Sequence, residues 1–276
     1  GIARRRCVAV PMPVSSPTEN REGAHGCFRM WDGMPISPTD GRAKGKIHYI
    51  CTKIYDPMLE GILFDMDGVL VNNTQAHVRA FAIFCERHGV TGWRDKLATA
   101  YGMGNDDIMR RILPPELIRE QGMQQLGEEK EAIYRAIYAP EIRPVAGLTE
   151  LLHALRTRGL RCAVGSSGPK ANVDFVLEAC GIADCFDACI CGDRVSRCKP
   201  DPEIYLKAAA ALGLPPSRCL VFEDAPAGIE SARRAGAGCV VALVTSLDRA
   251  ALEPCAPDRI IKDFTELTDL ETLLSC

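Results

Sequence analysis

From Pro144 to the C-terminus, short apolar segments alternate with segments that have the spacing of amphipathic helices. The first of these helices carries Leu148, Leu151 and Leu155 on one face, and Gly159 ends it. The alternation predicts strands at residues 161–165, 188–191, 219–222, 239–243 and near Ile260, and helices at 171–180, 202–212, 226–235 and 265–274. Such a succession implies a parallel sheet with helices on both faces.

One more apolar segment, residues 61–64, stands far upstream and has the composition of a buried parallel strand. Residues 74–142 separate it from the alternating part. They show no strand pattern and are predicted to be helical, with breaks near Gly102 and Pro114. We therefore expect an α/β fold, a doubly wound Rossmann-like parallel sheet with an inserted small helical cap domain. The expected core domain is residues 58–73 and 143–276, and the expected cap domain is residues 74–142.

Residues 1–57 differ from the rest in composition. They contain six Pro and six Gly and carry a net charge of 9 − 5 = +4. Such a segment buries little apolar surface, so it is predicted to be a disordered N-terminal extension. Met58 stands three residues before the first expected strand. The segment is therefore interpreted either as foreign to the natural protein or as a tail of unassigned role.

Charge and cysteine content exclude several classes of protein. The formal net charge, 33 − 36 = −3, gives no support for a nucleic-acid partner. No apolar run approaches the ~20 residues of a membrane helix, so no membrane partner is expected. The 14 cysteines include no Cys-x-x-Cys pair and are interpreted as reduced thiols rather than zinc ligands. Reduced thiols predict a cytoplasmic protein. We expect a monomer or a weak homodimer, which the composition does not decide.

Polar residues follow four of the expected strands at the point where each strand ends. They are Asp65 and Asp67, Ser166 and Ser167, Lys199, and Glu223 and Asp224. In sheets of this kind, ligands bind beyond the carboxyl ends of the strands. These carboxylates, hydroxyls and one ammonium are therefore expected to converge on a single site.

This set of groups fits phosphoryl transfer. Carboxylate oxygens suit Mg²⁺, and an Asp carboxylate can attack phosphorus to form an aspartyl phosphate. A second carboxyl two residues along can act as general acid and base. For Asp65 and Asp67 to face one site, the chain must leave strand geometry around Met66, which Gly68 permits. Lys199 and a serine hydroxyl can hold the phosphoryl oxygens.

Four segments of the sequence resemble the four motifs of the haloacid-dehalogenase superfamily. They are Phe64-Asp65-Met66-Asp67-Gly68-Val69-Leu70, the Ser166 segment, Lys199-Pro200 and Glu223-Asp224. The resemblance covers about residues 61–270 and is closest to the beta-phosphoglucomutase-like branch, which has a small helical cap. It implies a Mg²⁺-dependent enzyme in which Asp65 is the nucleophile and Asp67 the general acid and base.

The resemblance also implies roles for the other residues. Ser166, or alternatively Ser167, binds the phosphoryl group, and Lys199 pairs with the nucleophile and the phosphate. The metal ligands are Asp65, Asp224, Glu223 and the carbonyl of Asp67. His77 matches a histidine near the cap hinge and Asn172 a frequent asparagine, although each also has a structural interpretation as a core histidine or a helix cap.

Two positions depart from the family pattern. Asn72 stands where the family often has Asp, which is expected to affect the hinge rather than the chemistry. Asn105 stands where beta-phosphoglucomutases carry an arginine for a second phosphate, although Arg110 or Arg111 in the next helical turn could replace that arginine. The sequence therefore favours a phosphatase acting on a small phosphorylated metabolite, a sugar phosphate, with Asn105 and His77 near the substrate.

The sequence also bears on four other functions. A beta-phosphoglucomutase, an isomerase with the same nucleophile, is the main alternative, and phosphate release separates the two. A silent binding module is disfavoured because the motif carboxylates and Lys199 are all present. A dehalogenase does not need Asp67. A phosphonatase would use a cap lysine as a Schiff base, and neither Lys96 nor Lys130 lies in a recognisable motif.

Overall fold

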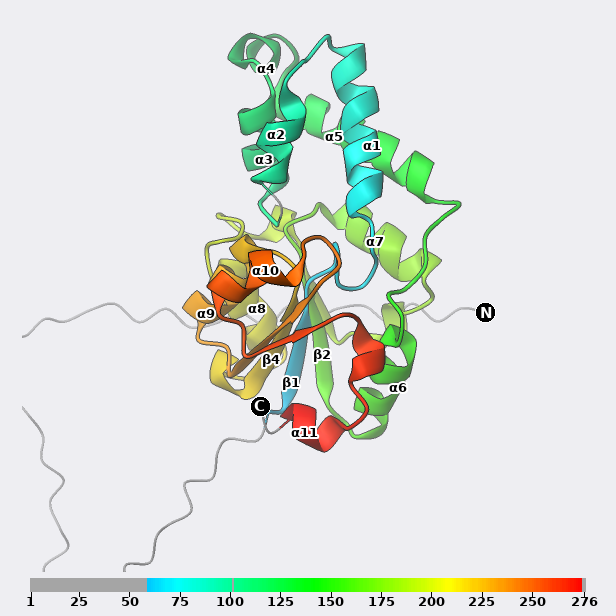
Figure 1. The fold of residues 1–276 in the computed structure, drawn as a ribbon, viewed down its shortest axis with the longest axis vertical. Coiled ribbons are helices and arrows are strands. Elements are labelled where there is room, and N and C mark those ends of the chain that lie inside the picture. Colours follow the sequence, from blue (N-terminus) through cyan, green and yellow to red (C-terminus); the bar gives the residue numbers. More distant parts are fainter. Residues whose placement is uncertain (1–58, 101, 275–276) are drawn as a thin grey trace, which may run out of the picture. The chain divides into compact units, whose positions relative to one another are not determined.

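The protein is described by a computed structural model that covers residues 59–100 and 102–274 (Figure 1). The extension expected at residues 1–57 lies outside the described residues. Within them, one sheet contains β1 (Gly61–Phe64), β2 (Arg161–Gly165), β3 (Ala188–Ile190), β4 (Cys219–Glu223), β5 (Cys239–Leu243) and β6 (Arg259–Ile261). All neighbouring strands are parallel, in the order β3-β2-β1-β4-β5-β6. The predicted doubly wound parallel sheet is thus confirmed.

The helices alternate with these strands except after β1, where six helices, α1 to α6, precede β2. The helices are α1 (Thr74–Arg87), α2 (Trp93–Ala98), α3 (Asn105–Ile112), α4 (Pro115–Gln121), α5 (Met123–Tyr138), α6 (Leu148–Thr157), α7 (Lys170–Ala179), α8 (Glu203–Ala211), α9 (Pro226–Ala235), α10 (Arg249–Leu252) and α11 (Leu270–Leu274). The terminal helix is shorter than the expected 265–274. Asp269 stops its extension because its carboxylate accepts the backbone N–H groups of Glu271 and Thr272.

Strand β1 lies at the centre of the sheet because its side chains are apolar on both faces. Ile62 and Phe64 pack with leucines of α6 and valines of α7, and Leu63 packs on the opposite face with α8 and α9. The register pairs Phe64 with Val164 on one side and with Phe222 on the other. This alignment brings the carboxyl ends of β1, β2 and β4 level with one another.

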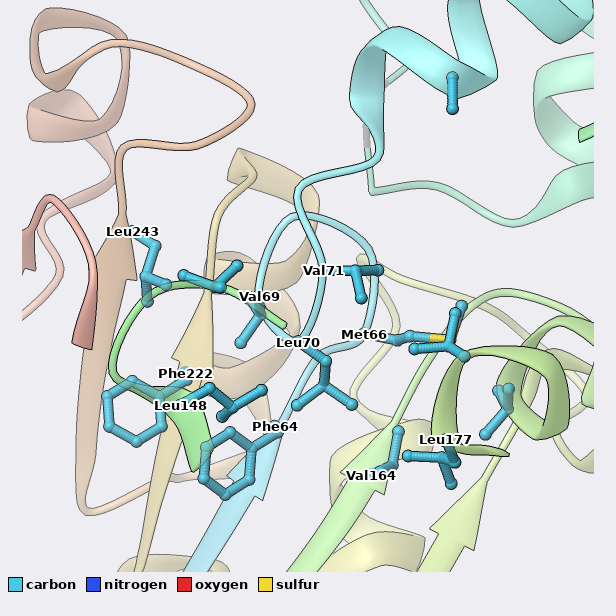
Figure 2. Close-up of a cluster of buried hydrophobic side chains, with 14 of the residues drawn as sticks. Phe64, Met66, Val69, Leu70, Val71, Leu148, Val164, Leu177, Phe222 and Leu243 are labelled. Carbon is cyan, nitrogen blue, oxygen red and sulfur yellow. The ribbon is translucent and has the colours of Figure 1, made fainter. Parts of the chain in front are cut away.

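The loop after β1 is anchored in the core although it carries polar residues. Its apolar side chains, Met66, Val69, Leu70 and Val71, are all fully buried. Figure 2 shows them beside Phe64, Leu148 and Phe222. Burial of these apolar residues fixes the backbone of the loop, so its polar side chains are held in place by packing.

Helices α1 to α5 lie together beyond the carboxyl ends of the strands, with α1 beside α5 (Figure 1). The breaks before α3 and before α4 fall near Gly102 and Pro114, as anticipated from the sequence, whereas the break at Gly122 between α4 and α5 was not anticipated. The two chain segments that join this group to the sheet run side by side. Val71 and Pro144 form an antiparallel bridge, and the Val145 N–H donates to the Leu70 carbonyl at 2.9 Å.

Within the described residues, no helix has the length and apolar character needed to cross a membrane. Nine of the described cysteines carry free thiols: Cys85, Cys162, Cys180, Cys185, Cys189, Cys191, Cys198, Cys219 and Cys255. The expectation of reduced thiols is wrong for Cys239, which is disulfide-bonded.

An aromatic cluster in the core allows the contribution of core packing to stability to be tested. Phe264 packs edge-on against Phe222 at 5.1 Å between ring centroids and is 2% exposed. We expect Phe264→Ala to lower the free energy of unfolding by about 3–5 kcal/mol, because it removes buried contacts and leaves a cavity. Urea denaturation followed by circular dichroism measures this loss. Leu206→Ala, at the surface, is the control, and an equal effect of both variants would contradict the assignment of the core.

Candidate active site

The turn after β1 presents two carboxylates to one cavity. The N–H groups of Val69 and Leu70 both donate to the Met66 carbonyl, so the chain leaves strand geometry at Met66 as the sequence predicted. Asp65 and Asp67 consequently line the same cavity, while the Met66 side chain is buried. Gly68 has φ of +80°, and a Cβ there would overlap the carboxylate of Asp224. Only glycine allows the loop this close approach.

The ammonium of Lys199 is buried against two carboxylates. Its Nζ donates to Asp65 Oδ1 at 2.5 Å, to Glu223 Oε1 at 2.7 Å and to the Tyr205 hydroxyl at 3.0 Å. Burial opposes the charge on Lys199, but Asp65 and Glu223 outweigh it and raise the pKa of the amine above its ordinary value. Lys199 is therefore a permanent cation that ties the ends of β1 and β4 together.

Three carboxylates share this buried region with one ammonium. Ligand atoms of Asp65, Glu223 and Asp224 all lie within 4.8 Å of one another. Burial and the neighbouring carboxylates outweigh Lys199 and raise the pKa of Asp65 to about 7, and the same causes raise the pKa of Asp224 well above its ordinary value. The uncompensated negative charge and the oxygen donors fit a divalent cation.

Asp67 faces the helical group rather than these three carboxylates. Its Oδ1 accepts the Asn73 side-chain N–H at 2.6 Å and lies 3.5 Å from His77 Nε2. Burial favours a higher pKa for Asp67, but His77 and Asn73 outweigh it and lower the pKa below its ordinary value. Asp67 is thus an ionised carboxylate in the free protein. The proposed metal contact through its carbonyl stays a prediction.

The two candidate serines after β2 occupy different environments. Ser166 is fully buried, and its Oγ accepts the Gly168 N–H at 3.0 Å, as in a turn. Ser167 lines the cavity and donates to the Gly102 carbonyl at 3.3 Å, next to α3. The structure therefore places Ser167, rather than Ser166, in the cavity wall, and the phosphate-binding role of each stays a prediction.

Lys130, to which the sequence analysis gave no role, is a buried lysine on the helical side of the cavity. Lys130 of α5 is 2% exposed, and its Nζ lies 2.6 Å from Glu131 Oε1 and 3.2 Å from His77 Nδ1. Leu126 and Tyr134, four residues to either side, are both fully buried. A charged residue within the apolar stripe of a helix is the signal that could have identified it.

One link joins the helical group to the sheet domain across the cavity. Asn172 of α7 donates to Glu131 Oε2 at 2.7 Å, and Arg135 donates to Asn172 Oδ1 at 2.7 Å. Asn172 is 1% exposed, so its amide is fully engaged between the two. Its contacts come from α5 rather than from the start of α7, so it is not the helix cap considered from the sequence.

The cavity itself is small and has walls from both sides. Its volume is about 90 Å³, and its walls include Asp65, Asp67 and Asp224 from the sheet domain and His77 and Asn105 from the helical group. Its lining also includes Lys130, Glu131, Ser167 and Asn172. Lys199 and Glu223 do not line it and lie behind Asp65. The predicted site residues thus converge, in two layers.

The structure has a parallel α/β sheet, two aspartates after its central strand, a buried lysine and a carboxylate cluster. Together these features are typical of one class of hydrolytic enzymes. Residues 59–236 match the family model of haloacid dehalogenase-like hydrolases. The chain belongs to this family. The predicted family and enzyme class are therefore confirmed.

Individual relatives agree with this assignment. Validoxylamine A 7'-phosphate phosphatase of Streptomyces hygroscopicus subsp. limoneus is 36% identical, over 76% of this chain and 96% of the relative. The crystal structure of CbbY from Rhodobacter sphaeroides in complex with phosphate has a TM-score of 0.67 at 28% identity, covering 78% of this chain and 99% of that chain. A beta-phosphoglucomutase from Clostridium difficile has a TM-score of 0.68 at 24% identity, covering 79% and 97%, which shows the shared fold.

The carboxylate cluster predicts cation binding that strengthens with pH. Because the pKa of Asp65 is raised from 3.8 to about 7, its ionisation destabilises the metal-free fold as pH rises through that window. A bound cation reverses this, since it requires ionised ligands. We therefore expect Mg²⁺ to raise the melting temperature more at about pH 8 than at about pH 6.

Thermal unfolding with and without Mg²⁺ measures this difference. Asp224→Asn, which removes one carboxylate of the cluster, is expected to abolish it. Equal stabilisation at both pH values, or none at either, would contradict cation binding by these ionisable groups.

Proposed function

We propose that this enzyme is a Mg²⁺-dependent phosphatase that hydrolyses a small sugar phosphate through an aspartyl phosphate on Asp65. The observation that carries the proposal is the Asp65 carboxylate, bonded to Lys199 and adjacent to Asp224 in the wall of a cavity that Asp67 also lines. Validoxylamine A 7'-phosphate phosphatase, a relative, and the CbbY structure in complex with phosphate support the same reaction.

Asp65 and Asp224 are the carboxylates of the cluster that line the cavity, so they are the residues to hold the metal ion. When bound, Mg²⁺ supplies positive charge that stabilises the phosphoryl oxygens. Lys199 holds Asp65 in place from behind through its 2.5 Å hydrogen bond. The nucleophile is thus oriented before the substrate arrives, which lowers the entropic barrier of the attack.

In the first step, a carboxylate oxygen of Asp65 attacks phosphorus. The bond from phosphorus to the ester oxygen breaks, and its electron pair goes to the leaving oxygen, which takes a proton from Asp67. Because Asp67 is ionised in the free protein, it takes up this proton from water before the attack, beside His77 Nε2 at 3.5 Å from its Oδ1. The Ser167 hydroxyl in the cavity wall can donate to a phosphoryl oxygen in place of the Gly102 carbonyl.

In the second step, Asp67 is again a carboxylate and removes a proton from water. The water oxygen attacks phosphorus, the bond to Asp65 breaks, and inorganic phosphate leaves. The lowered pKa of Asp67 in the free protein suits the start of this step, because the residue must be ionised to accept the proton.

Residues 74–142 act as a cap that closes over the substrate, with Val71 and Pro144 at its hinge. A cavity of about 90 Å³ is small beside the cavities of roughly 300–1,000 Å³ that bind small molecules in other proteins. A sugar phosphate therefore requires the cap to open for entry and release. The contacts of Asn172 with Glu131 and Arg135 support a closed arrangement.

The walls on the cap side favour hydroxyl groups over a second phosphate. Asn105 Oδ1 is buried and has no hydrogen-bond partner among the described residues, so it can accept a sugar hydroxyl. Lys130 is the cap cation that lines the cavity, its charge is shared with Glu131, and no arginine from the described residues joins it. This favours a monophosphate and hydrolysis rather than the mutase reaction.

Substitution of the nucleophile tests the mechanism. Asp65→Asn keeps the shape of the side chain but cannot attack phosphorus, so we expect turnover to fall at least about 10³-fold. The circular dichroism spectrum is expected to stay unchanged. Phosphate release under saturating substrate measures the effect. Retention of substantial activity by the folded variant would exclude Asp65 as the nucleophile.

The fate of the phosphate separates the phosphatase from the mutase. We expect free phosphate from one or more members of a panel of sugar monophosphates, with loss of the reaction on chelation of Mg²⁺. The panel includes beta-glucose 1-phosphate, for which formation of glucose 6-phosphate is followed in parallel. Glucose 6-phosphate formation with little free phosphate would instead identify a mutase.

A further inference from the structure

Both oxygens of the Glu223 carboxylate are already bonded to groups of the protein. Oε1 accepts the Lys199 ammonium at 2.7 Å and the Tyr205 hydroxyl at 2.5 Å. Oε2 accepts the Asp224 backbone N–H at 3.1 Å. A carboxylate with this many short hydrogen bonds has little capacity left for a cation.

The position of Glu223 supports the same conclusion. Its side chain is 1% exposed and does not line the cavity that Asp65 and Asp224 line. It lies against the first turn of α9, where a Cβ on Gly228 would overlap the carboxylate. Glu223 therefore sits behind the reacting groups, although its distance from Asp65 and Asp224 alone would allow a shared metal ion.

Tyr205 completes this enclosure from α8. It is fully buried, and its ring packs against Gly165 at the end of β2, where a side chain would press on the ring. Its hydroxyl donates to Glu223 and accepts from Lys199 at 3.0 Å, and Lys199 Nζ lies 4.8 Å from the ring centroid. One side chain thus contacts both members of the ion pair.

We propose that Tyr205 is a positioning residue whose hydroxyl fixes Glu223 as a clamp on Lys199, so that the metal ion is left to Asp65 and Asp224. The proposal rests on the proposed phosphatase function for its kinetic readout. Tyr205 does not line the cavity in which substrate and metal are proposed to bind. It acts by holding Glu223, which holds Lys199, which in turn orients Asp65.

The kinetic test uses Tyr205→Phe, which keeps the ring and removes the hydroxyl. With para-nitrophenyl phosphate as the probe, we expect kcat to fall about tenfold, as for the loss of a hydrogen bond to charged groups. KM and the Mg²⁺ dissociation constant are expected to change less than about threefold, because neither group is bound by Tyr205. Tyr138→Phe, the same substitution in a buried tyrosine of α5, is the control expected to leave kcat unchanged.

A lower melting temperature with unchanged kcat in Tyr205→Phe would mean a structural role only and overturn the proposal. Reduced Mg²⁺ affinity in parallel with kcat would also overturn it, since the hydroxyl would then act through the metal site.

The binding test compares two variants that each remove one negative charge from the same buried cluster. Isothermal titration of the metal-free proteins with Mg²⁺ requires no substrate. Asp224→Asn is expected to weaken binding at least about tenfold, whereas Glu223→Gln, which keeps an acceptor for Tyr205 and Lys199, weakens it far less. Equal weakening would make Glu223 a ligand and overturn the proposal.

Failure of the proposed function and failure of the proposal for Tyr205 give different results. Absence of Mg²⁺ binding by the wild-type protein contradicts the proposed function and the assignment of the metal to Asp65 and Asp224. The role of Tyr205 is decided separately, by the kcat of Tyr205→Phe relative to that of Tyr138→Phe.

Discussion

The buried ammonium of Lys199 is the interaction on which the rest of the site depends. Asp65, Glu223 and Asp224 lie together at the ends of β1 and β4, and their mutual repulsion would oppose folding without a cation among them. Lys199 satisfies two of these carboxylates directly. Loss of one partner from such a buried pair costs about 3–5 kcal/mol, so stability and orientation of the nucleophile have the same physical origin.

Asp67 connects the carboxylate cluster around Lys199 to the helical cap, which moves in the proposed mechanism. Its backbone is fixed by the buried apolar residues on either side, whereas its carboxylate bonds to Asn73 and lies close to His77 of α1. His77 in turn contacts Lys130. Movement of the cap would therefore change the surroundings of the general acid and base, which couples closure over the substrate to proton transfer.

The sequence predicted the sheet and the residues at the ends of its strands, because strand periodicity and parallel topology together define that edge. Asp65, Lys199 and Asp224 were found in this way. Tyr205 and Lys130 were not found, because they lie within helices, where packing decides which side chain reaches the site. A buried tyrosine in an apolar helix has the same sequence pattern as an ordinary core residue, so only its hydrogen bonds reveal its role.

Direct detection of phosphate on Asp65 tests the central claim. In Asp67→Asn, para-nitrophenyl phosphate should still phosphorylate the enzyme, since nitrophenolate leaves without a proton, while hydrolysis of the intermediate is slowed. Borohydride reduction during turnover, followed by peptide mass spectrometry, is predicted to convert Asp65 to homoserine. A burst of nitrophenolate with Asp65 unmodified, or with phosphate on another residue, would contradict the mechanism.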